Sequence, residues 1–180
     1  MRKQKGFSLI ELLIVVAIIL IIAAIAIPNL LRSKMSANDS AAVSSIRTIN
    51  TSEVTFSTTY PTQGYANTLT RLGPNATAGT CDATGACLID GVLACGQANG
   101  PCPKSGYNYF LLSSSNAAPF GDYTVSASPI TVNSTGTRNI CANADAVIKS
   151  TAGITSTPTA LAAGETAANC ALATKYLPIQ

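Results

Sequence analysis

The chain has 180 residues, of which 47% are hydrophobic and only 11% are charged. An ordinary soluble domain carries about 25% charged residues. The net charge of +3 comes from Arg2, Lys3 and Lys5, since the rest of the chain has eight basic and eight acidic side chains, and histidine is absent. The composition therefore excludes histidine-based catalysis and gives no support for a basic nucleic-acid-binding protein.

A long apolar segment follows the basic residues. Every residue in 12–27 is apolar, and residues 7–27 are interrupted only by Ser8 and Glu11. As a helix this segment rises by roughly 30 Å, the thickness of a bilayer core. The preceding basic residues predict a cytoplasmic amino terminus. A cleaved secretory signal is the alternative, with weak cleavage candidates at 23–26, but the apolar run is long for such a signal.

The junction between these segments resembles a known signal. Residues 5–12, KGFSLIEL, resemble the class III signal of type IV pilins and type II secretion pseudopilins. The resemblance implies cleavage after Gly6 by a prepilin peptidase and methylation of the new amino terminus on Phe7. The six-residue leader is similar to the type IVa and pseudopilin pattern. It implies a single-pass inner-membrane protein that later enters an extracellular filament, or a periplasmic one if it is a pseudopilin.

Glu11 is the single acidic residue in the apolar segment. We expect it to have no partner within its own helix, and a carboxylate in hydrocarbon is costly and usually functional. The resemblance implies that it pairs with the terminal amine of a neighbouring subunit, which would offset its desolvation and select an axial register. The alternative is that it lies at headgroup depth and extends to the interface.

Pro28 lies just beyond the apolar run. Proline lacks an amide donor and clashes with a preceding carbonyl, so a kink or loosening is predicted over residues 24–27. In the resembled family this region can lose helicity in the filament. That family often has glycine within the span, whereas residues 7–27 contain none.

Helical periodicity continues after Pro28. Apolar residues recur at spacings of 7, 4, 3 and 7, which is one face of an amphipathic helix: Met35, Ala42, Ile46, Ile49 and Phe56. The Tyr60-Pro61 pair, with Gly64 soon after, predicts the end of this helix. One helix over residues 8–58 would be about 75 Å long, so half of it must be covered by lipid or by other subunits.

The remaining chain predicts a head of loops and strands. Residues 61–106 are rich in glycine, threonine, alanine and asparagine, which is typical of a connecting loop, with short helices expected at 66–72 and 88–94. Strand signals follow at four places: 107–112, 123–127, 138–142 and 146–149. We expect an α+β fold in which the long helix packs on an antiparallel sheet of about four strands, within 107–149. The resemblance implies the same pilin-type architecture.

Six cysteines follow the membrane segment, which fits an oxidising compartment: Cys81, Cys87, Cys95, Cys102, Cys141 and Cys170. None of the spacings is Cys-x-x-Cys, so a zinc or thioredoxin-like site is not supported, and fifteen pairings are possible. Nearness favours Cys81–Cys87 and Cys95–Cys102, leaving Cys141–Cys170. The last pair would resemble the carboxy-terminal disulfide loop of many major pilins, here within residues 150–180.

No cofactor or metal is expected. Four aspartates raise the alternative of a calcium site like that of major pseudopilins, but their spacing does not match an EF-hand loop: Asp82, Asp90, Asp122 and Asp145. DNA binding, as by a competence pilin, lacks a basic patch with interleaved aromatic residues.

The sequence therefore predicts a structural filament subunit rather than an enzyme. Residues 1–6 would be a cleaved leader, 7–31 the membrane and filament-core helix, 32–60 its amphipathic continuation and 61–180 the head. The expected partners are identical or related pilin subunits, the inner membrane, prepilin peptidase and the pilus or secretion assembly machinery. A type II secretion pseudopilin or a minor pilin would share the same signal. A membrane-anchored binding domain that never polymerises would retain Met1.

Overall fold

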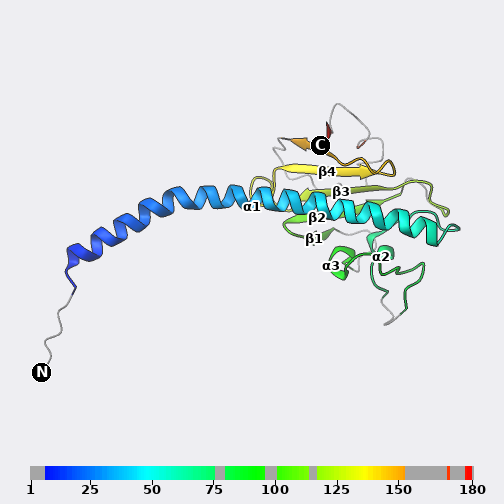
Figure 1. Ribbon diagram of the computed structural model, residues 1–180, viewed down its shortest axis with the longest axis horizontal. Helices are drawn as coiled ribbons and strands as arrows, with labels where there is room; N and C mark the ends of the chain where they lie inside the picture. The colour runs from blue at the N-terminus through cyan, green and yellow to red at the C-terminus, as the bar shows by residue number, and fades with distance from the viewer. Residues whose placement is uncertain are drawn as a thin grey trace, which may run out of the picture. The chain divides into compact units, whose positions relative to one another are not determined.

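The computed structural model describes residues 7–75, 80–95, 101–113, 117–152, 170 and 177–179. The chain divides into two compact units, Met1–Lys34 and Met35–Gln180. Helix α1, Leu9–Thr59, belongs to both, and the head belongs to the second (Figure 1). The expected leader, with Gly6, and most of the expected tail at 150–180 lie outside the described residues.

Helix α1 is 51 residues long and ends one residue before Tyr60-Pro61. Proline disfavours the helical conformation in the residue before it and removes a donor, which explains the stop. The part of α1 in the second unit buries one face, on which Ala42, Ile46 and Ile49 are completely buried. This is the face that the sequence periodicity predicted.

One antiparallel sheet forms the second layer of the head. Its six strands pair in chain order as a meander: β1 Cys102–Lys104, β2 Tyr107–Leu112, β3 Thr124–Pro129, β4 Arg138–Asn143, β5 Lys149–Ala152 and β6 Leu177–Pro178. The second half of α1 crosses one face of this sheet (Figure 1). The predicted α+β class, a long helix packed on an antiparallel sheet, is confirmed.

The sheet has two more strands than the four that were expected. Strand β1 pairs with β2 through a two-residue turn in which Ser105 and Gly106 both have positive φ, 49° and 77°. That backbone is typical of a tight hairpin. Strand β6 is only two residues long and pairs with β5. Pro103 and Pro178 weaken the strand signal of these segments, and the sheet tolerates both prolines because they lie on its edge strands.

Two short helices organise the loop between α1 and the sheet, near the expected positions. They are α2, Leu69–Leu72, and α3, Gly91–Ala94. Asp90 caps α3 by accepting hydrogen bonds from the Val92 and Leu93 amides, at 3.0 and 2.9 Å. The Leu88 amide donates to the Leu72 carbonyl over 2.7 Å, so the two helices are held together by backbone contacts.

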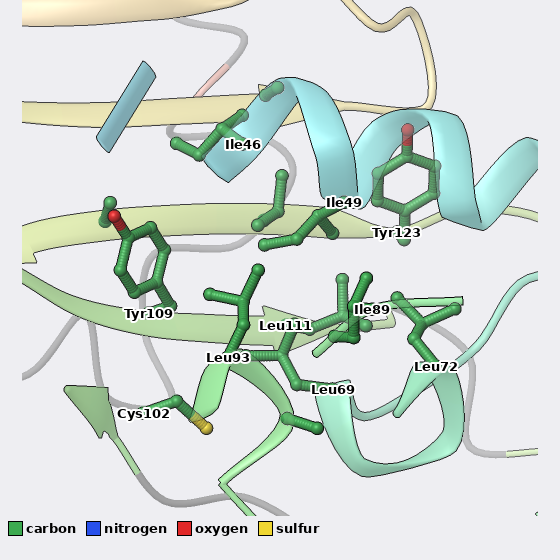
Figure 2. Close-up of a cluster of buried hydrophobic side chains, with 14 of the residues drawn as sticks. Ile46, Ile49, Leu69, Leu72, Ile89, Leu93, Cys102, Tyr109, Leu111 and Tyr123 are labelled. Carbon is green, nitrogen blue, oxygen red and sulfur yellow. The ribbon is translucent and has the colours of Figure 1, made fainter. Parts of the chain in front are cut away.

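The core lies between α1, the sheet and this loop. Figure 2 shows Ile46 and Ile49 from α1 on one side of the cluster and Tyr109 from β2 beside them. Leu72 and Leu93 from the short helices close the other side, and all five side chains are buried. The loop therefore completes the core rather than merely connecting its layers.

Gly64 should be the least replaceable glycine in the junction after α1. It has φ of +71°, and a Cβ there would collide with the backbone of Phe120. We expect Gly64→Ala to lower the unfolding free energy of the head by about 1–3 kcal/mol or more. At Gly121 a Cβ would meet no atom within 4 Å. Gly121→Ala should therefore change the unfolding free energy by less than about 0.5 kcal/mol. Denaturant unfolding of the full chain in detergent would measure both, and equal losses would contradict the prediction.

Candidate functional site

The start of α1 carries the predicted assembly residues. Ser8 precedes the helix, and Glu11 lies in its first turn. The Ser8 backbone N–H donates a hydrogen bond of 2.9 Å to Glu11 Oε2. This is one half of a capping box, in which a glutamate at the third helical position reaches back to the residue before the helix. The expectation that Glu11 has no partner in its own helix is therefore wrong, and its spacing from Ser8 was the overlooked signal.

The cap leaves the charge of Glu11 uncompensated. In the part of the chain that the structure describes, no cation pairs with Glu11. The helix dipole favours a negative group in this first turn. Phe7 lies four residues before Glu11 and is 92% exposed. The carboxylate is thus held at the end of the helix where cleavage after Gly6 would create a terminal amine.

The first part of α1 is covered by apolar side chains on all sides. Its large aliphatic residues, from Leu9 to Leu31, are all exposed. The helix is long and apolar enough to cross a membrane, and none of its most apolar window is buried within the chain's own fold. Leaving a large aliphatic side chain in water costs about 1.5–3 kcal/mol relative to burying it. This surface therefore requires lipid or other protein against it.

Pro28 lies inside α1, which is helical without interruption from Leu9 to Thr59. Because proline has no N–H, the carbonyl four residues earlier, of Ala24, lacks its usual helical donor. The kink expected at residues 24–27 stays a prediction.

Polar residues of α1 fasten the helix to the head. The Tyr107 hydroxyl donates to Asp39 over 2.6 Å, and the Thr137 hydroxyl donates to the other oxygen of the same carboxylate over 3.2 Å. Further along, the Tyr123 hydroxyl donates to Asn50 over 3.2 Å. Burial, and then the hydrogen bond to Asp39, raise the pKa of Tyr107, so its hydroxyl stays a donor at all physiological pH values. These contacts join the helix to β2 and to the residues that directly precede β3 and β4.

Glu53 is a buried acid that the sequence analysis missed. Its side chain is fully buried, and Oε2 accepts a 2.8 Å hydrogen bond from the Ala66 backbone N–H. Oε1 has no partner among the described residues. Burial raises the pKa of Glu53 to about 8, although the Ala66 N–H and the Arg71 charge lower it in part. Glu53 is therefore mostly neutral at pH 7 and joins α1 to the start of the loop.

Three disulfides are present in the head: Cys81–Cys87, Cys95–Cys102 and Cys141–Cys170. These are the pairs favoured by sequence nearness and by the resemblance. Cys95 follows α3 and Cys102 begins β1, so the second disulfide ties the loop to the sheet. The described residues contain no free cysteine and no group of three metal-ligating side chains.

The amino-terminal segment matches known proteins. Residues 1–27 match the family described as the prokaryotic N-terminal methylation motif. Over 39 residues the chain is 67% identical to the type IV wide pilus major component PilA4 of Thermus thermophilus, covering 22% of this chain and 30% of the relative.

This amino-terminal segment therefore resembles those of type IV pilins and of a type II secretion system core protein. The chain is also 44% identical over 54 residues to the type IV major pilin protein PilA of Myxococcus xanthus, covering 30% of this chain and 24% of the relative. It is 48% identical over 46 residues to the type II secretion system core protein G of Vibrio cholerae, covering 26% of this chain and 32% of the relative. These names describe structural components rather than enzymes.

The matches cover only part of each protein. The chain spans less than a third of the length of each of these three relatives. No solved structure matches the chain. The account of the head therefore rests on the head's own structure.

Glu53 should make the stability of the head depend on pH. Its pKa rises from an ordinary 4.5 to about 8 on folding. The stability contributed by the neutral form is complete below pH 4.5 and is lost as the pH rises through 8. Glu53→Gln keeps an acceptor for the Ala66 N–H and cannot ionise. We expect it to be more stable than the wild type at pH 9, by on the order of a few kcal/mol, in thermal unfolding of the detergent-solubilised chain.

Asp82→Asn is the matched control for this experiment. Asp82 is exposed, and hydrogen bonds from Thr84 lower the pKa of its carboxyl group. Its stability contribution is present above its ordinary pKa and is lost only in acid. The Asp82→Asn profile should therefore run parallel to the wild type between pH 6 and 9. A Glu53→Gln profile that also ran parallel over that range would contradict the role of Glu53.

Proposed function

We propose that this chain is a structural subunit of a type IV pilus-like filament, polymerised from the inner membrane through its amino-terminal helix. The observation that carries the proposal is the apolar first part of α1. No part of its most apolar window is buried by the chain's own fold. Lipid covers this surface in the single subunit, and the helices of neighbouring subunits cover it in the filament. Because both environments are apolar, hydrophobic burial changes little on assembly, and packing and electrostatics must set the order.

Glu11 supplies the electrostatic part of this proposal. Cleavage after Gly6 gives Phe7 a charged terminal amine, which remains charged after methylation. In the low-dielectric filament core, this amine and the carboxylate of a neighbouring subunit attract strongly, whereas a shifted register leaves both charges unpaired. The hydrogen bond from Ser8 supports this role because it holds the carboxylate at the helix end.

The charge distribution supports one membrane orientation. The basic leader keeps the amino terminus cytoplasmic, so the disulfide-bonded head lies on the outer side of the inner membrane. The leader then faces prepilin peptidase at the cytoplasmic surface. Extraction by the pilus machinery would follow, with Pro28 as the point where α1 loosens. In this proposal residues 1–6 are the leader, 7–31 the filament-core helix, 32–60 its continuation and 61–180 the head.

A pseudopilin of a type II secretion system is the second candidate. It is favoured by the 48% identity over 46 residues to the type II secretion system core protein G. A minor pilin would share the same segment. Electron microscopy of sheared surface fibres, with mass spectrometry of their subunits, separates these roles. A major pilin dominates the fibres, a minor pilin is rare in them, and a pseudopilin stays in the periplasm.

The amino terminus of the mature protein tests the processing step. We expect intact-mass and peptide mass spectrometry to find a chain that begins at Phe7 with one added methyl group. In a strain without prepilin peptidase, the chain should begin at Met1 and remain in the membrane. A mature wild-type chain that begins at Met1 would overturn the proposed function and favour a membrane-anchored domain that does not polymerise.

Two substitutions at Glu11 separate its two contacts. Glu11→Gln keeps an acceptor for the Ser8 N–H but removes the charge, and Glu11→Lys reverses the charge. If intersubunit pairing orders the filament, we expect Glu11→Lys to abolish surface filaments and Glu11→Gln to reduce their yield at least about tenfold. Both variants should keep wild-type subunit levels and disulfides. Wild-type filament yield from Glu11→Lys would refute the pairing.

A further inference from the structure

A polar groove lies between α1 and strand β4. It has a volume of about 380 Å³. Ser36, Ser40, Ser44 and Arg47 of α1 line one side, and Arg138 of β4 lies on the other. All of these residues belong to the unit Met35–Gln180. The Ser40 hydroxyl already donates to the Ser36 carbonyl over 3.0 Å. The groove thus offers two guanidinium groups and the hydroxyl groups of Ser36 and Ser44 to one ligand.

The groove carries an excess of positive charge. Its single carboxylate, Asp39, faces inward, where Tyr107 and Thr137 donate hydrogen bonds to both of its oxygens. Arg138 Nε lies 4.0 Å from that carboxylate, at the limit of an ion pair. The exposed Arg47 guanidinium has no hydrogen-bond or ion-pair partner within the ranges that the structure describes. A carboxylate fits this site because it can accept charge-assisted hydrogen bonds from the guanidinium and further hydrogen bonds from the neighbouring hydroxyl groups.

Among the exposed carboxylates of the head that the structure describes, Asp82 best supplies the opposite charge. Asp90 and Asp145 are also exposed but already pair with Lys104 at 2.6 Å and Lys149 at 3.1 Å. The Asp82 carboxylate is bonded instead to neutral groups of Thr84 and Asn75.

The Asp82 loop is held in one conformation. The backbones of Asp82 and Gly85 bond to each other twice, both at 3.1 Å, and the Cys81–Cys87 disulfide closes the segment. Binding through such a preformed loop costs little conformational entropy. Hydrogen bonds from Thr84 lower the pKa of Asp82, so the carboxylate stays charged in mildly acidic surroundings.

The groove and the Asp82 loop lie at opposite ends of the second half of α1. The loop is bonded to Arg71, whose Nε donates to the Ala83 carbonyl over 3.0 Å, and Arg71 lies over the Phe56 ring at 5.4 Å. The groove takes its α1 residues from 36–47. At 1.5 Å per residue, Phe56 is about 15–30 Å further along the helix. One chain therefore holds the two complementary surfaces far apart.

We infer that Asp82 of one copy of this chain docks beside Arg47 in the groove of the next copy. This inference rests on the proposed filament function and names one contact between the heads. The contact joins two different surfaces, the groove of one copy and the Asp82 loop of another. It is therefore heterologous and generates an open polymer rather than a closed dimer. The hydroxyl groups of Ser36 and Ser44 donate to the docked carboxylate, and Arg47 supplies the charge.

Charge reversal in cells tests the pairing. Arg47→Glu and Asp82→Arg should each lower the yield of sheared surface filaments at least about tenfold, because like charges then meet in the groove. The double variant should recover to within about threefold of the wild type. Asp145→Arg is the control, since that position lies outside the proposed contact, and it should assemble normally. Total subunit level and non-reducing gel mobility show that each variant folds.

The outcomes separate this inference from the proposed function. Absence of filaments from the wild type contradicts the proposed function itself. Wild-type filaments together with normal assembly of Arg47→Glu overturn the docking contact alone. Failure of the double variant to recover, with normal subunit levels, overturns the pairing of these two residues.

A cross-linking experiment identifies the occupant of the groove directly. Arg47→Lys keeps the charge and supplies an amine that carbodiimide can join to a carboxylate in contact with it. In filaments grown from mixed light and heavy isotopes, we expect a cross-link between position 47 of one chain and Asp82 of another. A dominant cross-link from position 47 to Asp122 or Glu165, or to a carboxylate of the same chain, would overturn the inference.

Discussion

The apolar surface of residues 7–31 constrains everything else in this protein. A helix with aliphatic side chains on every side must be covered, and none of the most apolar window of α1 is covered by its own chain. Lipid would satisfy this need for a single subunit, and neighbouring helices would satisfy it in the proposed polymer. Exchange between two apolar environments has a small hydrophobic free-energy change. Specific order must therefore come from the few polar groups near this surface.

The head is stabilised without help from that surface. Ile46, Ile49 and Phe56 bury one face of α1, while Asp39 and Asn50 bond to tyrosines of the sheet. Disulfides then tie the loop to strand β1 and strand β4 to Cys170. Such a head could stay folded while the amino-terminal helix moved from a membrane into the proposed filament.

The sequence predicted features that depend on local pattern and missed those that depend on long-range contacts. The end of α1 near Tyr60-Pro61 and the strand Tyr107–Leu112 follow from proline chemistry and from residue type. Strand β6 was missed because two residues with a proline carry no strand signal until β5 lies beside them. Glu53 was missed although it continues the apolar register, because a charged residue is usually assigned to the solvent face. The capping partner of Glu11 was readable from its spacing to Ser8.

The two glutamates of α1 show how one residue type meets two different demands. Glu53 lies in a closed core, where the Ala66 N–H and the positive charge of Arg71 only partly offset the effect of burial. Burial therefore favours its neutral form. Glu11 lies on an open surface, where its single hydrogen bond from Ser8 leaves lone pairs and charge for a partner. A neutral Glu11 would give no electrostatic preference for one axial position of a neighbouring helix. Glu53 can therefore stabilise the fold without its charge, whereas Glu11 would have to keep its charge to order the proposed polymer.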